Sequence, residues 1–143
     1  MPNRKASARW TGPLSEGQGT MRLGSGAYEG PFSFQTRRGD EPGTNPEELI
    51  GAALAGCFSM ALSGALGKAG VTAPVVDTEA TVTFEQSGGG WGISRIALVT
   101  RVKAAGLDEA RFQAIAAETK QQCPVSRALA ATPIDLEATL LAE

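Results

Sequence analysis

The sequence predicts an α+β fold in a single domain spanning residues 1–143. Three short segments with strand character come first, a long helical segment follows, and a β-hairpin, a second helix and a last strand complete the chain. Strands and helices in this mixed order indicate sheets with helices packed on them. A chain of 143 residues is long enough to bury a real hydrophobic core.

The first 43 residues combine short strands with turns. We expect strands at Ala8–Trp10, Gly19–Leu23 and Pro31–Thr36, because apolar and polar residues alternate there between glycine-rich segments. The segment 40–43, Asp-Glu-Pro-Gly, has the composition of a turn. This part of the chain therefore predicts a small sheet that ends in a loop before the first long helix.

The clearest helix start in the chain lies at Asn45 and Pro46. Asparagine is a favoured N-cap residue, proline suits the first helical position, and the two glutamates that follow complement the positive end of the helix dipole. We expect this helix to run to about Ala69, where Gly70 supplies the residue that ends it.

This helix predicts a homodimer. Its segment Leu49–Gly67 has no charged side chain over 19 residues, and a helix without a polar side must be buried all round. One chain has little material to surround about 35 Å of helix, and small residues would let a second helix approach closely. These small residues are Ala52, Ala53, Gly56 and Gly64. The segment is too rich in Ala, Gly and Ser for a membrane span, so we expect no membrane contact.

The remaining elements follow from alternation and from end signals. Residues Val75–Glu85 and Gly92–Ala104 alternate apolar and polar side chains on either side of a glycine-rich turn, which predicts a long hairpin. Leu107–Gln122 has the helical period, with Asp108 as its N-cap. A short helix at Pro124–Ala130 and a strand at Ile134–Ala142 complete the prediction.

Composition excludes several classes of function. A net charge of −2 gives no electrostatic reason to expect a nucleic-acid partner. The chain has no histidine, which excludes Ser–His and Cys–His nucleophile pairs and imidazole zinc ligands. The basic N-terminal segment lacks the apolar stretch of a secretory signal, so we expect a cytoplasmic protein in which a disulfide forms only transiently.

The two cysteines, Cys57 and Cys123, are the main candidates for covalent chemistry. Cys57 lies in the middle of the long helix, where the helix dipole no longer lowers a thiol pKa. Cys123 precedes Pro124 at the start of a helix, so local rules favour it as the thiol of low pKa. The alternative is that both are buried cysteines that act as small hydrophobic residues. Two cysteines alone do not make a metal site.

Charged residues lie on either side of the start of the long helix. Glu47 and Glu48 could be functional carboxylates, but their place at the helix start explains both, and the residues alone favour that role. Arg37 and Arg38 lie just past the third expected strand, where a pair of arginines usually forms a solvated edge that prevents sheet-to-sheet aggregation.

Four segments resemble the OsmC/Ohr family of osmotically inducible and organic hydroperoxide resistance proteins. They are the run 43–62 around Cys57, the Cys-Pro-Val-Ser of residues 123–126, the Phe-Gln-Thr-Arg of residues 34–37, and the strand 134–141. The resemblance implies an OsmC-like fold, with antiparallel sheets wrapped around two long central helices in an intertwined homodimer.

The resemblance also implies a peroxidase that reduces organic hydroperoxides, and hydrogen peroxide less well. Cys57 would attack the peroxide, Cys123 would resolve the sulfenic acid as a disulfide, Arg37 would stabilise the thiolate, and Glu47 would orient Arg37. An external dithiol, for which a lipoyl-type dithiol is a candidate, would recycle the enzyme without a bound cofactor or metal. Arg38 stands where relatives often have an aromatic residue, which leaves the substrate preference open.

Two alternatives to the peroxidase remain at this stage. A non-catalytic stress protein would bind apolar ligands in the dimer cleft and keep inert thiols. A general thiol–disulfide exchange protein would act without peroxide, but the chain lacks the usual Cys-x-x-Cys pair.

Overall fold

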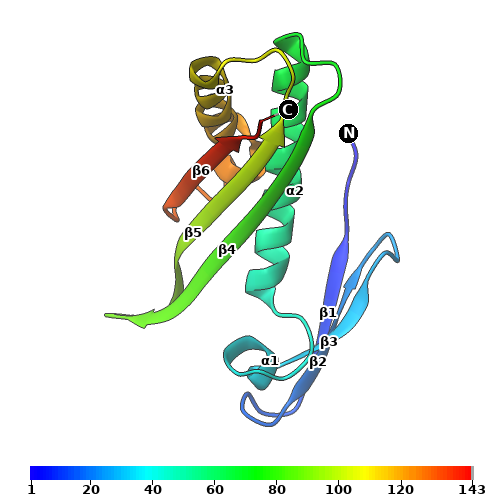
Figure 1. Cartoon of the computed structure of the whole chain (residues 1–143). Coiled ribbons are helices and arrows are strands. Elements are labelled where there is room, and N and C mark those ends of the chain that lie inside the picture. The colour runs from blue at the N-terminus through cyan, green and yellow to red at the C-terminus, as the bar shows by residue number, and fades with distance from the viewer. Residues whose placement is uncertain (143) are drawn as a thin grey trace. The chain divides into compact units, whose positions relative to one another are not determined.

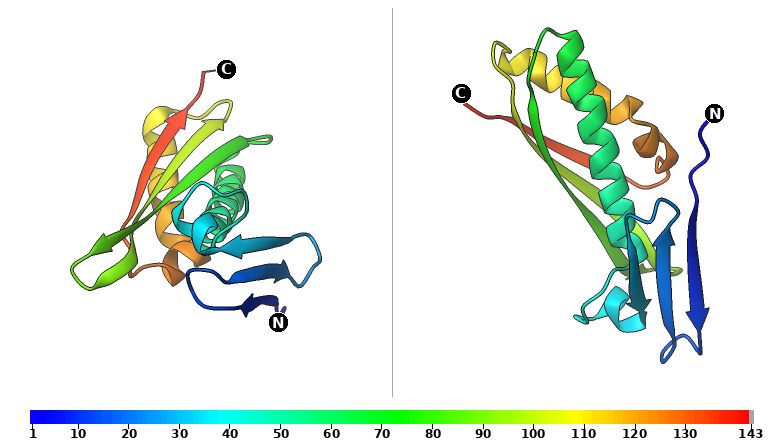
Figure 2. Two further views of the ribbon diagram at one scale, coloured as in Figure 1. Left: turned by 90° about the horizontal axis from the view of Figure 1, so that it is seen from below. Right: turned by 90° about the vertical axis from the view of Figure 1, so that its right-hand side faces the viewer.

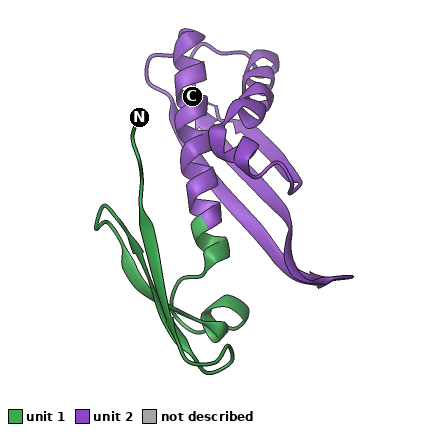
Figure 3. Ribbon diagram, turned by 180° about the vertical axis from the view of Figure 1, so that it is seen from behind, with its two compact units in different colours: residues 1–49 green, residues 50–143 purple. Residues whose placement is uncertain are grey.

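The computed structural model describes residues 1–142 of the chain. They form two compact units, one up to Leu49 and one from Ile50 onward (Figure 3). Helix α2 (Pro46–Lys68) begins in the first unit and continues in the second. The expectation of a single domain stays a prediction.

The first unit contains a three-stranded antiparallel sheet in the order β1-β2-β3. Its strands are β1 (Ala6–Thr11), β2 (Gln18–Leu23) and β3 (Glu29–Ser33), followed by the short helix α1 (Phe34–Arg38). All three expected strands are present, and the first two are longer at their ends than alternation indicated. The third is displaced toward the N-terminus and ends earlier.

The expectation that the third strand runs to Thr36 is wrong, because a capping box begins a helix at that point. The Ser33 hydroxyl accepts hydrogen bonds from the N–H groups of Gln35 and Thr36, both at 3.1 Å. The Thr36 hydroxyl oxygen in turn accepts one from the Ser33 N–H at 2.8 Å. These reciprocal bonds satisfy donors that a new helix leaves without partners. Arg37 therefore lies on a helix, where a strand end was expected.

The start and end of α2 agree with the sequence-based expectation. The Asn45 side-chain oxygen accepts a hydrogen bond from the Glu48 N–H at 2.8 Å, so Asn45 acts as the N-cap, and Pro46 is the first helical residue. The helix ends at Lys68, and Gly70 follows with a φ of 97°. Such a positive φ is accessible to glycine at no steric cost, which explains why the chain turns there.

The second unit is built on a three-stranded sheet in the order β4-β5-β6 (Figure 1). Strands β4 (Val75–Ser87) and β5 (Gly90–Lys103) form the expected antiparallel hairpin. Strand β6 (Ile134–Leu140) pairs with β5 in parallel, so the expectation of purely antiparallel sheets is wrong for this pair. A parallel pair needs a long crossover, which helices α3 (Glu109–Gln122) and α4 (Pro124–Ala128) provide here.

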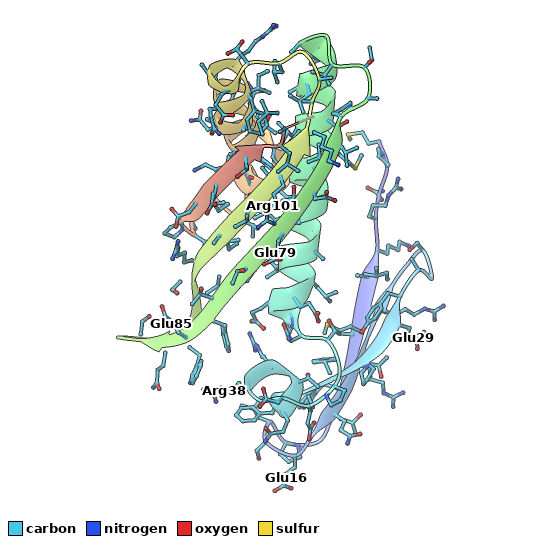
Figure 4. The ribbon with its side chains drawn as sticks, viewed as in Figure 1. Glu16, Glu29, Arg38, Glu79, Glu85 and Arg101 are labelled. Atoms are coloured by element: carbon cyan, nitrogen blue, oxygen red, sulfur yellow. The ribbon has the colours of Figure 1, made fainter. Side chains whose placement is uncertain are left out.

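The core of this unit lies between one face of the sheet and helices α2 and α3 (Figure 2). Each large side chain that is fully buried there contributes roughly 1.5–3 kcal/mol. The large apolar side chains that are fully or almost fully buried are Leu54, Phe58, Leu62, Leu66, Ile96, Leu98, Val102 and Phe112. The alternating residues point the other way, and among them Glu79 and Arg101 are exposed (Figure 4).

A chain of hydroxyl groups fixes α2 to the sheet. The Ser59 hydroxyl donates to the Thr78 hydroxyl oxygen at 2.8 Å, and Thr78 lies 2.9 Å from the hydroxyl of Thr100. The Thr100 hydroxyl donates to the Asp77 carbonyl at 3.2 Å, so the buried oxygen atoms all have partners. Ser59 therefore connects α2 to the sheet through a hydrogen bond.

The opposite side of α2 is exposed and carries small or apolar side chains. Met60 is 79% exposed, and Ala52, Ala53, Gly56 and Gly64 are also exposed. By length and composition, α2 is the one helix among residues 1–142 that could cross a membrane, and 28% of that apolar stretch is buried within this chain. A helix without a polar face requires burial on all sides, and the single chain does not provide this for α2.

Candidate active site

Cys57 and Cys123 meet within the second unit, although 66 positions separate them in the sequence. The distance between their Sγ atoms is 3.0 Å, and both are free thiols. A disulfide bond is about 2.05 Å long, so the two sulfur atoms need to approach by only about 1 Å to bond. Cys57 is partly buried, whereas Cys123 is fully buried. The pair can therefore form a disulfide, and its more accessible sulfur is that of Cys57.

Cys123 is placed by the junction of two helices. It ends α3 and is the N-cap of α4, with Pro124 as the first residue of α4. The sequence predicted this break, because a residue before proline is pushed out of the helical region. The Cys123 N–H donates to the Thr119 carbonyl at 2.9 Å, and the Cys123 carbonyl accepts from the Arg127 N–H at 3.0 Å. Both backbone groups of Cys123 are thus satisfied.

The environments of the two thiols shift their pKa values in opposite directions. Burial raises the pKa of the Cys57 thiol, and its contact with Cys123 raises it further, while the Val125 backbone N–H opposes this change. Burial alone would also raise the pKa of Cys123. The neighbouring Cys57 thiol, both the backbone and side chain of Ser126, and the Val125 backbone outweigh burial and lower it. The pKa of Cys123 is thus lowered while that of Cys57 is raised.

Arg37 and Glu47 form a bidentate ion pair within the first unit. The Arg37 Nη2 lies 2.7 Å from Glu47 Oε1, and its Nε lies 3.1 and 3.2 Å from the two carboxylate oxygens. The Glu47 side chain is 8% exposed and that of Arg37 is 42% exposed. The carboxylate thus fixes the orientation of a guanidinium that still reaches solvent. This pair and the cysteine pair belong to different units, and each is described within its own.

The structure separates the two glutamates that the sequence could not distinguish. The exposed Glu48 belongs to the helix start, because its N–H donates to Asn45 and its carboxylate accepts from the Thr44 hydroxyl at 2.9 Å. The buried Glu47 instead pairs with Arg37. Arg38, the neighbouring cation, lies 4.9 Å from the centre of the Phe34 ring. The two arginines thus have different surroundings.

Ser126 is a site residue whose importance the sequence analysis missed. It is 6% exposed, and within the described chain its Oγ is buried without a hydrogen-bond partner. The spacing Cys-x-x-Ser is that of an N-cap and the third helical residue, whose side chains approach each other in a capping box. That spacing could have identified Ser126. Residues 1–142 contain no group of three or more His, Cys, Asp or Glu side chains that could hold a metal ion.

Comparison with known proteins gives consistent results. Residues 39–138 match the family model described as OsmC-like protein. The chain is 45% identical over 130 residues to the peroxiredoxin OsmC of Escherichia coli K12, a match that covers 90% of this chain and 91% of that protein. It is 33% identical over 99 residues to an organic hydroperoxide resistance protein of Xanthomonas axonopodis pv. citri, covering 68% of this chain and 67% of that protein.

Solved structures share the fold at lower identity. An OsmC-like protein of unknown function from Vibrio cholerae has a TM-score of 0.76 and 16% identity, and the match covers 96% of this chain and 99% of that one. The organic hydroperoxide resistance protein OhrB of Bacillus subtilis has a TM-score of 0.70 and 23% identity, covering 97% and 98% of the two chains. These likenesses confirm the expected α+β fold.

Proposed function

Because this chain belongs to the OsmC-like protein family, we propose that it is a thiol-dependent peroxidase that reduces organic hydroperoxides, and hydrogen peroxide less well. The observation that carries the proposal is the 3.0 Å distance between the Cys57 and Cys123 sulfur atoms. The names of the relatives, a peroxiredoxin and an organic hydroperoxide resistance protein, support the same type of reaction. Two inert core thiols would not need to meet at this distance.

The proposed cycle uses each thiol once. The Cys57 thiolate attacks the distal peroxide oxygen, the O–O bond breaks, and an alcohol leaves with a proton from the medium. Cys57 is then a sulfenic acid, and the Cys123 thiolate attacks its sulfur to form the disulfide and expel hydroxide, which takes a proton from the medium to become water. An external dithiol, such as a lipoyl-type dithiol, reduces the disulfide and becomes a disulfide itself. This recycling suits the reducing cytoplasm that we propose as the location.

The raised pKa of Cys57 means that the proposed reaction needs a positive charge near the Cys57 sulfur. Burial and the Cys123 contact favour the protonated form of Cys57, which is the more accessible thiol but is unreactive when protonated. A guanidinium beside the Cys57 sulfur would favour its thiolate instead. We assign this role to Arg37, with Glu47 as the positioning carboxylate, and Arg37 acts either in its own subunit or in the partner of a dimer.

The proposed assembly is a homodimer formed through the exposed side of α2. A Cβ atom built at Gly56 or at Gly64 meets nothing within 4 Å in this chain. The single chain therefore gives no steric reason for glycine at either position, and glycine costs up to about 1 kcal/mol relative to alanine inside a helix. Close approach of a second helix explains both residues, and it covers the exposed Met60.

Substitution at Gly56 tests the dimer. In an isolated chain, the Cβ of Gly56→Leu meets no atom within 4 Å, whereas in a close helix pair the leucine should keep the two helices apart. We expect sedimentation to show a dimer for the wild type and a shift toward the monomer for Gly56→Leu. Ala114→Leu, at an exposed position of α3, is the matched control and should leave the dimer intact. A wild-type monomer would contradict the assembly.

Steady-state turnover tests the reaction. With excess dithiol, we expect many turnovers of cumene or tert-butyl hydroperoxide, and fewer of hydrogen peroxide. Cys57→Ser should abolish turnover, and Cys123→Ser should stop the reaction at a sulfenic acid that dimedone traps. Arg37→Ala should slow oxidation of Cys57 about tenfold, the effect of about one pKa unit on the thiolate fraction, while Arg38→Ala should have little effect.

Two results would replace this proposal by its alternatives. Binding of apolar ligands without turnover, and unaffected by loss of both cysteines, would favour a non-catalytic binding protein. Reduction of disulfides at equal rates with and without peroxide would favour a general exchange protein.

A further inference from the structure

The hydroxyl group of Ser126 is a buried polar group that the proposed cycle does not yet use. Ser126 lies three residues after Cys123, on α4, and is 6% exposed. Its Oγ, in the part of the chain that the structure describes, has no hydrogen-bond partner. A buried hydroxyl without a partner is destabilising, so its retention calls for an explanation.

The Cys123 sulfur is the partner that remains for this hydroxyl. In a capping box the side chain of the third helical residue bonds to the N-cap N–H. Here that N–H already donates to Thr119, and the Cys123 carbonyl already accepts from Arg127. The hydroxyl hydrogen rotates freely and a thiolate accepts hydrogen bonds strongly, so this hydroxyl can donate to the Cys123 sulfur once that sulfur is a thiolate. The lowered pKa of Cys123, to which hydrogen bonding by Ser126 contributes after the opposing effect of burial, agrees with this arrangement.

The two sulfur atoms also differ in access. Cys123 is fully buried, while Cys57 is only partly buried. A dithiol that reduces the Cys57–Cys123 disulfide must approach one sulfur in line with the S–S bond and expel the other as a thiolate. Access favours attack at Cys57. Stabilisation of the departing thiolate favours Cys123 as the leaving group, because a thiol of lower pKa leaves faster.

We propose that the reductant attacks the Cys57 sulfur of the disulfide and that Ser126 is a positioning residue whose hydroxyl stabilises the departing Cys123 thiolate. The proposal rests on the proposed function for the existence of the Cys57–Cys123 disulfide, and it requires that the Cys57 sulfur stays open to a dithiol in the proposed dimer. It specifies which sulfur of the disulfide the reductant attacks. The distance between the two sulfur atoms alone does not specify this.

Reduction of the disulfide takes place by two successive displacements at sulfur. A thiolate of the reductant forms an S–S bond to Cys57, the Cys57–Cys123 bond breaks, and its electron pair leaves on Cys123 Sγ. The second thiol of the reductant, as thiolate, then attacks its own mixed-disulfide sulfur and releases Cys57 as a thiolate. The protein disulfide is reduced by two electrons, and the dithiol is oxidised to a cyclic disulfide.

Mapping the mixed disulfide tests the direction of attack. The wild-type protein is oxidised to its disulfide with diamide, mixed briefly with excess β-mercaptoethanol, and quenched in acid with N-ethylmaleimide. Peptide mass spectrometry should find mercaptoethanol on Cys57 and maleimide on Cys123 at the earliest times. Mercaptoethanol on Cys123, extrapolated to zero time, would overturn the proposal.

Two variants test the part of Ser126. Ser126→Ala removes the hydroxyl, and Ser126→Thr keeps it. In a Cys57→Ser background, absorbance at 240 nm should show a Cys123 pKa raised by about one unit in Ser126→Ala and restored in Ser126→Thr. Single-turnover reduction of the disulfide by dithiothreitol should slow about threefold in Ser126→Ala alone. An unchanged pKa and an unchanged rate in a folded Ser126→Ala protein would remove Ser126 from the mechanism.

The use of diamide separates this proposal from the peroxidase. If peroxides do not oxidise the protein but diamide does, and mercaptoethanol is found on Cys57, the peroxidase is refuted and the direction of attack stands. If turnover with peroxide is rapid and the adduct is on Cys123, the reverse holds. Failure of every oxidant to form the disulfide would overturn both.

Discussion

The ion pair between Arg37 and Glu47 predicts that removing the arginine costs more than removing both charges. The Glu47 carboxylate receives three close contacts from the guanidinium, at 2.7, 3.1 and 3.2 Å, and its side chain is 8% exposed. In Arg37→Ala this carboxylate stays buried and loses its charged partner. In the double variant Arg37→Ala/Glu47→Gln no buried charge remains.

The magnitude follows from the burial of the two partners. Breaking a fully buried ion pair costs about 3–5 kcal/mol, and exposed pairs contribute about 0–1 kcal/mol. Because 42% of the Arg37 side chain reaches solvent, the cost of Arg37→Ala falls between these limits, at about 2 kcal/mol. We expect about 1 kcal/mol for Glu47→Gln and also about 1 kcal/mol for the double variant. The coupling energy between the two residues is then roughly 2 kcal/mol.

Urea unfolding at one fixed protein concentration measures all four free energies of unfolding. Arg38→Ala is the control. Arg38 is exposed, and the contact of its guanidinium with the Phe34 ring contributes about 0.5–1 kcal/mol at an exposed site. A double variant that loses the sum of the two single losses would refute the reasoning. So would an Arg37→Ala protein as stable as the wild type.

Three further predictions concern the other local features of the fold and the thiols. Ser33→Ala removes the acceptor of the capping box and should cost about 1 kcal/mol in urea unfolding, and Ser33→Thr, which keeps the hydroxyl that also donates to Glu41 Oε2 at 3.2 Å, should restore most of it. Thr100→Val keeps the shape of a fully buried residue but removes a hydroxyl from the buried chain, which should cost about 1–2 kcal/mol, and an unchanged stability would contradict its structural role. The reduced protein should lose its thiol protons in two steps at 240 nm, one below the ordinary thiol pKa and one above it, because the pKa of Cys123 is lowered and that of Cys57 raised. A single step for both thiols would refute this coupling.

Local rules predicted the elements that depend on a few neighbouring residues. The start of α2 follows from Asn45 and Pro46, and the break between α3 and α4 follows from Pro124, because both signals act within one helical turn. The parallel pairing of β6 depended on the path of the crossover, which alternation along one strand does not contain. The helix α1 was missed because the segment is short and its apolar residues fit a strand equally well.

The site shows a similar division. The pattern around Cys123 favoured it as the thiol of low pKa, and the family resemblance overturned this preference by giving the attacking role to Cys57. The pairing of Cys123 with Cys57 also came from the resemblance, and the sulfur atoms do lie 3.0 Å apart. Glu47 and Glu48 looked equivalent because both suit a helix start, and only their different burial separates them. Burial depends on residues distant in the chain, so no local pattern could have assigned it.

The opposite pKa shifts of the two thiols impose a condition on any peroxidase built on this pair. The more accessible residue, Cys57, has the raised pKa, and the buried Cys123 has the lowered one. Attack on a peroxide by Cys57 therefore needs an added positive charge near its sulfur, whereas expulsion of Cys123 from the disulfide does not. If Arg37 supplies that charge, Arg37→Ala should slow oxidation by peroxide and leave reduction by dithiothreitol unchanged in single-turnover measurements. Equal slowing of both half-reactions would mean that Arg37 supports the structure of the site as a whole, and the cation that activates Cys57 would have to be sought elsewhere.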